Sequence, residues 1–154
     1  MGGEVPLVFI QIAIALKDWG PKAVPVLEDL YNKSSDFDVR LKTLVSLGGI
    51  GDEKAIEILA KKASKKVETN SDLRMGAVSE LGGFKKSEVA LNALLNSYKE
   101  EPESNVRNEI IFRLGMIGSD KALDVLKEAT KDTHLLVRES AKMALDKIQS
   151  KPKK

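Results

Sequence analysis

The sequence contains no cysteine and only one histidine, His134. The first absence excludes disulfide bonds and thiolate metal sites, although it fits a reducing cytoplasm and an oxidising compartment equally well. Without a second histidine a zinc site would have to rest on carboxylates, and none are spaced for one. The sequence therefore predicts no catalytic residue, no metal and no cofactor, and we expect His134 to be solvent-exposed or helix-capping.

Aromatic side chains and charge of one sign are also scarce. The formal net charge is +2 over 154 residues, and aromatic residues make up 5% of the chain. The longest apolar segment, Val5–Leu16, falls short of the roughly 20 residues that cross a bilayer, and no basic residues precede it as in a signal peptide. We therefore expect neither a nucleic-acid nor a membrane partner, and a location in the cytoplasm.

What the chain does have is an internal repeat. A hydrophobic residue followed by arginine recurs at Arg40, Arg74, Arg107 and Arg138, at spacings of 34, 33 and 31 residues. A leucine follows each arginine by seven residues, and in the first three copies it begins a glycine-rich segment. A period in the low thirties with loops of variable length is typical of a stacked helical solenoid.

Each repeat predicts a helix around the arginine, a turn at the glycines and a second helix, such as Asp52–Lys66 or Ser119–Lys131. Asp52, Ser87 and Ser119 are expected to cap the second helices. The segments VRLKTLVSLGGIGDEKAIEILAKKA and VRNEIIFRLGMIGSDKALDVLKEAT resemble HEAT repeats of the bacterial and archaeal subtype known from the phycobilisome (PBS)-lyase HEAT-like proteins. The resemblance implies an all-α fold: an α/α superhelix of about four and a half repeats and nine helices, with the arginine-bearing helices on the concave face.

The two ends of the expected solenoid differ. We expect one HEAT-like domain over residues 4–149 and a disordered basic tail over residues 150–154. Phe9 occupies the arginine position of the first copy, so the chain is predicted to open with half a repeat. Lys142 stands in an otherwise apolar column and caps the C-terminal end. No such substitution protects the first helix, so either a homodimer through the N-terminal helix or a further repeat upstream is expected to cover it.

The arginine column has two interpretations. In the first, Arg40, Arg74, Arg107 and Arg138 form a structural ladder with acidic or polar residues and tie adjacent repeats together. The expected partners lie one loop earlier in each repeat: Asp36 and Asp38, Asp72, Glu103 and Asn105, and Asp132. In the second, exposed guanidinium groups form an anion-binding row for an acidic peptide or a phosphate backbone, which the net charge of +2 does not support.

A second column lies five residues after each arginine and is expected to point into the groove, unless the twist of the repeats buries it. With neighbours on the same face it forms the predicted partner-binding site: Leu41, Lys42, Val45, Met75, Asn108, Glu109, Phe112 and Met143. An apolar strip of this kind suits an amphipathic helix or an extended peptide. We also expect Glu80 and Arg113, which share a column in successive repeats, to form an inter-repeat ion pair.

The function predicted from the sequence alone is a non-catalytic protein–protein interaction scaffold that binds a peptide or protein through its concave groove. A bilin lyase-like or lyase-accessory protein is the alternative, and a nucleic-acid binder ranks third. The glycine run 48–51 follows a helix rather than the strand that a dinucleotide-binding loop requires. The sequence therefore predicts that the chain is not an enzyme.

Overall fold

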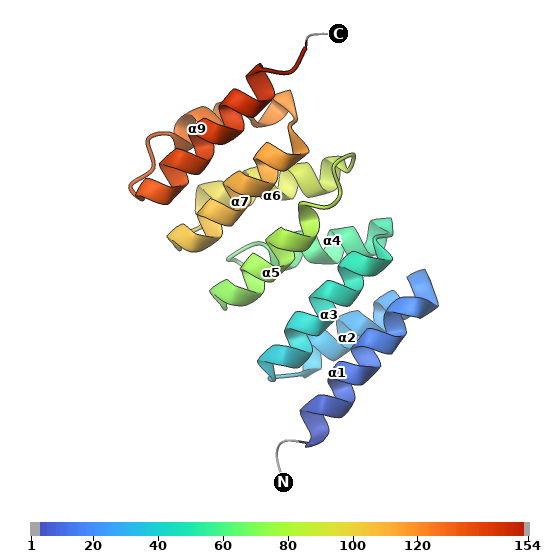
Figure 1. Cartoon of the computed structure of the whole chain (residues 1–154). Coiled ribbons are helices and arrows are strands. Elements are labelled where there is room, and N and C mark those ends of the chain that lie inside the picture. Colours follow the sequence, from blue (N-terminus) through green and yellow to red (C-terminus); the bar gives the residue numbers. More distant parts are fainter. Residues whose placement is uncertain (1–3, 153–154) are drawn as a thin grey trace.

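The computed structural model describes residues 4–152, and helices account for most of them (Figure 1). The α-helices are α1 (Glu4–Leu16), α2 (Val24–Lys33), α3 (Phe37–Ile50), α4 (Glu53–Lys62), α5 (Ser71–Leu81), α6 (Glu88–Glu100), α7 (Ser104–Ile117), α8 (Leu123–Ala129) and α9 (Leu135–Gln149). Two 3-10 segments, η1 (Lys17–Ala23) and η2 (Asp120–Ala122), lead into α2 and α8. The expected tail begins after α9, and its residues 153–154 lie outside the described part of the chain.

The helices form two layers (Figure 1). The odd-numbered helices α1, α3, α5, α7 and α9 lie side by side in the odd layer, and α2, α4, α6 and α8 form the even layer behind them. Neighbouring helices contact each other more extensively in the odd layer than in the even layer, as expected for the inner side of a curved solenoid. The prediction of an all-α solenoid of stacked helix pairs is confirmed, and over residues 4–152 four pairs are followed by α9.

The half repeat lies at the opposite end from the one predicted. Helix α1 is followed by η1 and by α2, which packs on α3, so the first repeat has both of its helices. Helix α9 is instead the one without an outer partner among the described residues. Helix α2 was not predicted because the segment before it lacks the N-terminal cap residue of the later repeats. This segment contains Gly20, with a φ of +65°, and prolines lie there and in the first turn of α2.

The ends of the helices follow the predicted glycines and caps. Gly51 and Gly118 end α3 and α7 with φ values of +63° and +66°, a conformation that costs a residue without a Cβ little. The side chains of Asp52 and Ser87 accept hydrogen bonds from the N–H groups three positions on and begin α4 and α6. These local signals therefore position the turns between the two layers.

The second helix of a repeat is shorter than expected. The helix expected over residues 52–66 ends with α4 at residue 62, and the N–H groups of residues 67 and 68 both bond to the Ser64 carbonyl. This turn brings Glu68, which is only 2% exposed, between two repeats. The helix expected over residues 119–131 divides into η2 and α8.

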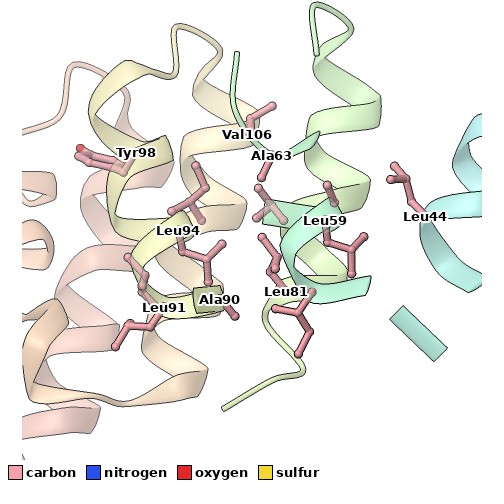
Figure 2. Packing of buried hydrophobic residues seen from close by; sticks show 14 of the residues in the cluster. Leu44, Leu59, Ala63, Leu81, Ala90, Leu91, Leu94, Tyr98 and Val106 are labelled. Carbon is pink, nitrogen blue, oxygen red and sulfur yellow. The ribbon is translucent and has the colours of Figure 1, made fainter. Parts of the chain in front are cut away.

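One continuous apolar core runs between the two layers (Figure 2). Leu44 of α3, Leu59 of α4 and Leu81 of α5 are 0% exposed. Gly115 lets α7 approach α9 closely, because a Cβ built there would lie 2.7 Å from the Cβ of Ala144. Since a fully buried leucine contributes about 1.5–3 kcal/mol, this core is the main source of stability of the stack.

The first helix keeps an apolar outer face, as its sequence indicates. Leu7 and Val8 are 60% and 56% exposed. Phe9 and Ile12 line an open groove of about 320 Å³ together with Val26 of α2. Among the described residues, no helix combines the length and apolar character needed to cross a membrane.

Candidate functional site

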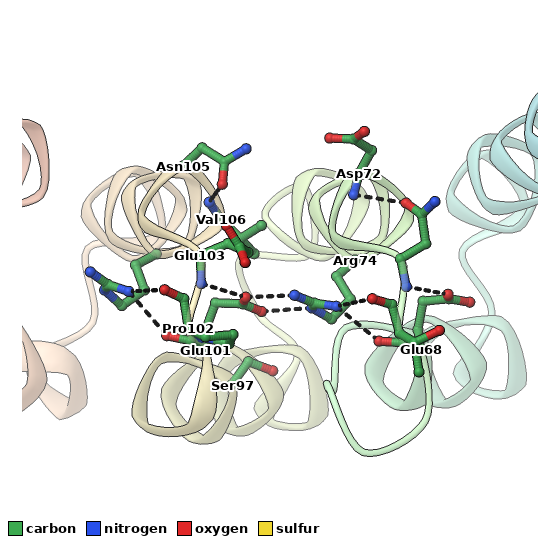
Figure 3. Close-up of polar contacts among 12 residues, drawn as sticks. Glu68, Asp72, Arg74, Ser97, Glu101, Pro102, Glu103, Asn105 and Val106 are labelled. Carbon is green, nitrogen blue, oxygen red and sulfur yellow. Dashed lines mark hydrogen bonds and ion pairs between the residues drawn. The ribbon is translucent and has the colours of Figure 1, made fainter.

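Arg74 makes the most completely buried ion pair among the described residues (Figure 3). Its Nε and Nη2 donate to Glu101 Oε2 and Oε1, both at 2.7 Å, in a bidentate ion pair. Its Nη1 donates to the main-chain carbonyls of Glu68 (3.0 Å) and Thr69 (2.9 Å). The side chains of Arg74 and Glu101 are 2% and 1% exposed, so both charges depend on each other for compensation.

The same arrangement recurs in the neighbouring repeats. Arg107 holds Asp132 through Nε and Nη2 at 2.8 and 3.0 Å, and its Nη1 donates to the carbonyls six and five residues before it. Arg40 pairs with Glu68 through Nη2 alone, and its guanidinium lies over the Tyr31 ring, 4.4 Å from the centroid. Each of these three arginines therefore ties its own repeat to the next one.

The acids of the ladder differ from those expected. Glu68, Glu101 and Asp132 each lie six residues before one arginine and pair with the arginine of the preceding repeat. The acids and the amide expected one loop before their own arginine do not pair with it: Asp36, Asp38, Asp72, Glu103, Asn105 and, for Arg138, Asp132. Each ladder carboxylate accepts the N–H two positions on, which holds it facing the previous repeat. The column of acids at this offset was the signal that sequence reasoning missed.

The surroundings of Asp132 favour its charged form. Burial opposes the ionisation of Asp132, but hydrogen bonds from Arg107, from the His134 N–H and from Tyr98 lower its pKa to about 2. Burial raises the pKa of Tyr98 and of Tyr31 well above the usual value, and each hydroxyl donates to a ladder acid. The three paired guanidinium groups are therefore engaged by carboxylates and are not free to form an anion-binding row.

The apolar strip expected on the odd layer, which consists of Val45, Phe112 and Met143, faces solvent. These side chains, from α3, α7 and α9, are 43%, 51% and 73% exposed. Phe112 and Met143 line an open groove of about 250 Å³ between α7 and α9. Leu41 and Met75, also expected in the site, are partly buried against the core and contribute less open surface.

Of the polar residues expected beside the strip, one is exposed and two make hydrogen bonds to neighbouring helices. The exposed residue is Lys42. Asn108 accepts a hydrogen bond of 2.7 Å from a serine of α9. Glu109 accepts hydrogen bonds from Ser79 (2.8 Å) and from Arg113 (2.7 Å), so α5 and α7 are connected at the edge of the strip. Of these, Lys42 alone is free of such a contact among the described residues.

The ion pair expected between Glu80 and Arg113 does not form. Arg113 pairs instead with Glu109, one turn earlier on its own helix, and its guanidinium lies 5.5 Å from the centroid of the Phe112 ring. The Glu80 carboxylate lies against Gly48 of α3, where a Cβ would overlap with it. Burial raises the pKa of Glu80 above its usual value, and the positive charge of Arg113 offsets this rise only in part. The glycine made room for Glu80 to turn toward the preceding repeat.

The lone histidine lies away from the strip. His134 is the N-terminal cap residue of α9, its side chain is exposed, and its backbone N–H donates to Asp132. Within residues 4–152 no group of three or more His, Cys, Asp and Glu side chains could hold a metal ion. The candidate site on the odd layer is the apolar strip with its polar edge.

Comparison with known proteins gives three findings. The family model described as HEAT repeats matches residues 63–146, more than half of the chain. Deoxyhypusine hydroxylase of Drosophila pseudoobscura pseudoobscura is 30% identical over 121 residues, which cover 78% of this chain and 39% of that protein. The structure of human deoxyhypusine hydroxylase in complex with glycerol superposes with a TM-score of 0.70 and 25% identity, over 83% of this chain and 44% of that one. This chain spans less than half the length of either.

Both similar proteins are hydroxylases, and this corrects two predictions made from the sequence. The prediction of a non-catalytic scaffold, with a bilin lyase-like protein as the alternative, is wrong, and so is the prediction that the chain is not an enzyme. The error arose because the repeat columns record helix packing, which is the same whether or not a solenoid serves a reaction. The match to the family model and the stacked helix pairs show that this chain belongs to the HEAT-repeat family.

Proposed function

We propose that the chain is the HEAT-repeat portion of an enzyme related to deoxyhypusine hydroxylase, and that its odd layer docks the polypeptide substrate. The observation that carries the proposal is the similarity to these hydroxylases over about four fifths of the chain, in sequence and in structure. The deoxyhypusine named in both relatives is accordingly the first substrate to test, presented within a polypeptide.

The apolar strip supports docking on the odd layer. Val45, Phe112 and Met143 come from three different repeats and are all exposed, so a bound segment would cross several helices. Exposed apolar side chains beside polar groups are typical of a protein-binding surface. The groove of about 250 Å³ beside Phe112 is the size of one large side chain rather than of a whole cofactor.

The oxygen-activating step is not assigned to residues of this chain. Hydroxylation inserts an oxygen atom and calls on a redox cofactor, and a non-haem iron site takes two histidines and a carboxylate. The described residues do not fit such a site, because His134 is the one histidine of the chain and no suitable cluster surrounds it. Substrate recognition is therefore the role proposed for these residues.

A binding assay with two matched valines tests the proposal. Val45 on the odd layer and Val89 on the even layer are 43% and 41% exposed, so serine substitutions remove nearly equal apolar surface. The probe is a fluorescent deoxyhypusine-containing peptide, with the unmodified peptide as its control. Fluorescence anisotropy should show binding that Val45→Ser and Phe112→Ser weaken by about tenfold, or about 1.4 kcal/mol, while Val89→Ser leaves it unchanged.

Two outcomes would overturn the proposal: equal weakening by the two valine substitutions, or no preference for the modified peptide. Incubating chain and peptide with oxygen and a reductant, followed by mass spectrometry, separates recognition from catalysis. A gain of one oxygen atom in the peptide would show that the chain also carries the chemical step.

The finer family assignment is a separate proposal. We infer that the repeats belong to the PBS-lyase HEAT-like subtype as a class of sequence, and the glycine-rich turns that follow the arginine helices support this. A phylogeny built from single repeats tests it: grouping with other HEAT subtypes would overturn it. No lyase activity is part of this assignment.

We also propose that a second copy of the chain covers the apolar N-terminal end in solution. The exposure of Leu7 and Val8 supports it, and the same patch on a second copy can cover it in a two-fold interface. Asp29 and Lys33, which pair with each other at 2.8 Å, form a polar rim beside the same groove. Light scattering should report a dimer that Phe9→Asp dissociates without loss of helix content. A wild-type chain that is monomeric at high micromolar concentration would overturn this proposal.

A further inference from the structure

Arg138 repeats the main-chain anchor of the ladder but not its ion pair. Its Nη1 donates to the carbonyls of Asp132 (2.9 Å) and Thr133 (3.0 Å), which lie six and five residues before it. Arg74 and Arg107 bind carbonyls at the same two offsets through the same nitrogen. All three guanidinium groups are therefore held in the same way against the start of their own helix.

This anchor determines where the other edge of the guanidinium points. In Arg74 the Nε and Nη2 edge binds both oxygens of the Glu101 carboxylate, at 2.7 Å (Figure 3). The same edge of Arg107 binds both oxygens of Asp132, at 2.8 and 3.0 Å. In Arg138 no described residue accepts a hydrogen bond from this edge. The guanidinium plane is rigid, so fixing Nη1 leaves a preoriented pair of donors toward the open end of the stack.

Elsewhere in the chain, the arginine and acid columns match. Phe9 stands at the arginine position of the first copy, and Ser34 stands at the acid position that such an arginine would address. Of the four arginines that follow, Arg40, Arg74 and Arg107 each have their acid, and the last does not. Arg138 is thus the one ladder arginine whose carboxylate is missing from the described residues.

We propose that the Nε and Nη2 edge of Arg138 binds the side-chain carboxylate of an aspartate or glutamate at the start of a further helix, outside the described residues. In the filled sites the carboxylate binds the arginine and also accepts a hydrogen bond from the backbone N–H two residues later, at the start of a helix. The occupant that fits is therefore an acidic residue two positions before a free N–H at a helix start. The inference does not rest on the proposed function, because it concerns a different face of the solenoid.

The surface around Arg138 suits such a segment. Leu135, one turn earlier on α9, is 58% exposed and shares a helix face with Arg138. Lys142, one turn later, is exposed and adds positive charge, although Glu139 takes one of its hydrogen bonds at 2.8 Å. Leu135 and Leu136 stand three and two residues before Arg138, where the residues before Arg74 are Ser71 and Asp72. The surface beside Arg138 is therefore more apolar than the corresponding surface of α5.

The test uses a peptide whose acid fills such a site within the chain. Residues 98–112 contain Glu101 and the start of α7, and the matched control carries Glu101→Gln. NMR of the arginine Nε–H groups should show a saturable shift of the Arg138 signal with the first peptide. The affinity should fall about tenfold with the control peptide and with Arg138→Lys, which keeps the charge but loses the bidentate fork.

Two further measurements separate carboxylate binding at Arg138 from a general effect of charge. Acetate alone, titrated into the wild-type chain, should shift the Arg138 Nε–H signal before the signals of Arg74 and Arg107, and this needs no variant. Lys147→Gln serves as the charge control and should leave peptide binding unchanged. Equal binding of both peptides, undiminished binding to Arg138→Lys, or an Arg138 signal unmoved by both probes would each overturn the inference.

Discussion

Replacing Arg74 by methionine should be among the most costly single substitutions in the ladder. Methionine fills much of the space of the arginine stem but leaves the Glu101 carboxylate buried without its partner. Breaking a buried ion pair from one side costs about 3–5 kcal/mol, because the remaining charge stays desolvated. For a domain of this size the melting temperature should fall by on the order of 10 °C.

Arg138→Met is the matched control, since Arg138 makes the same two carbonyl contacts but no ion pair with a described residue. It should cost about 1 kcal/mol, the value of partly exposed hydrogen bonds. The double variant Arg74→Met/Glu101→Leu should recover most of the loss, because no unpaired charge remains. Urea unfolding followed by circular dichroism, with the slope m compared between variants, measures all three.

Equal losses of unfolding free energy in Arg74→Met and Arg138→Met would contradict a cost that comes from the unpaired Glu101. So would a double variant no more stable than Arg74→Met. Either result would mean that the desolvated carboxylate is not the origin of the cost. The ladder would then act mainly through its carbonyl contacts.

Three further predictions concern other parts of the stack. Phe112→Ala should cost about 1 kcal/mol in thermal unfolding, since half of the side chain is already exposed, whereas Ile110→Ala, at a site 0% exposed, should cost about 2–5 kcal/mol. The pKa of Asp132 is lowered from 3.8 to about 2, so its stabilising effect is complete above pH 3.8 and lost as the pH falls through about 2. A pH series of urea unfolding should show this loss in the wild type and not in Asp132→Asn. Gly51→Ala should lower the melting temperature more than Gly20→Ala. Both glycines have a positive φ, but only at Gly51 would the new Cβ lie 2.8 Å from an aromatic carbon. Equal melting temperatures of the two variants would contradict this.

The fold could be predicted because its signals are short-range. The glycine after α3, the caps Asp52 and Ser87 and the recurring arginine each act within a few residues, and each does so in the structure. The location of the half repeat could not be predicted in the same way. Helix α2 carries none of these signals and is held by its packing against α3.

The candidate site was predicted less well, for reasons that lie between repeats. The exposure of Phe112 follows from its place on the helix, which the period of the sequence provides. Whether Arg113 meets Glu80 or Glu109 depends on the space that Gly48 leaves on a neighbouring helix. The similarity to hydroxylases cannot be inferred from the recurring repeat positions, because the residues at these positions pack the helices against each other.

The sequence by itself determined that this protein is a solenoid of helix pairs, since helix periodicity, capping and turn chemistry are properties of neighbouring residues. The tertiary structure alone decided which acid each arginine meets. The partners lie 25 to 28 residues apart and come together only when two repeats stack. The open edge of Arg138 became visible for the same reason: a missing partner can be recognised only after the geometry of the filled sites is known.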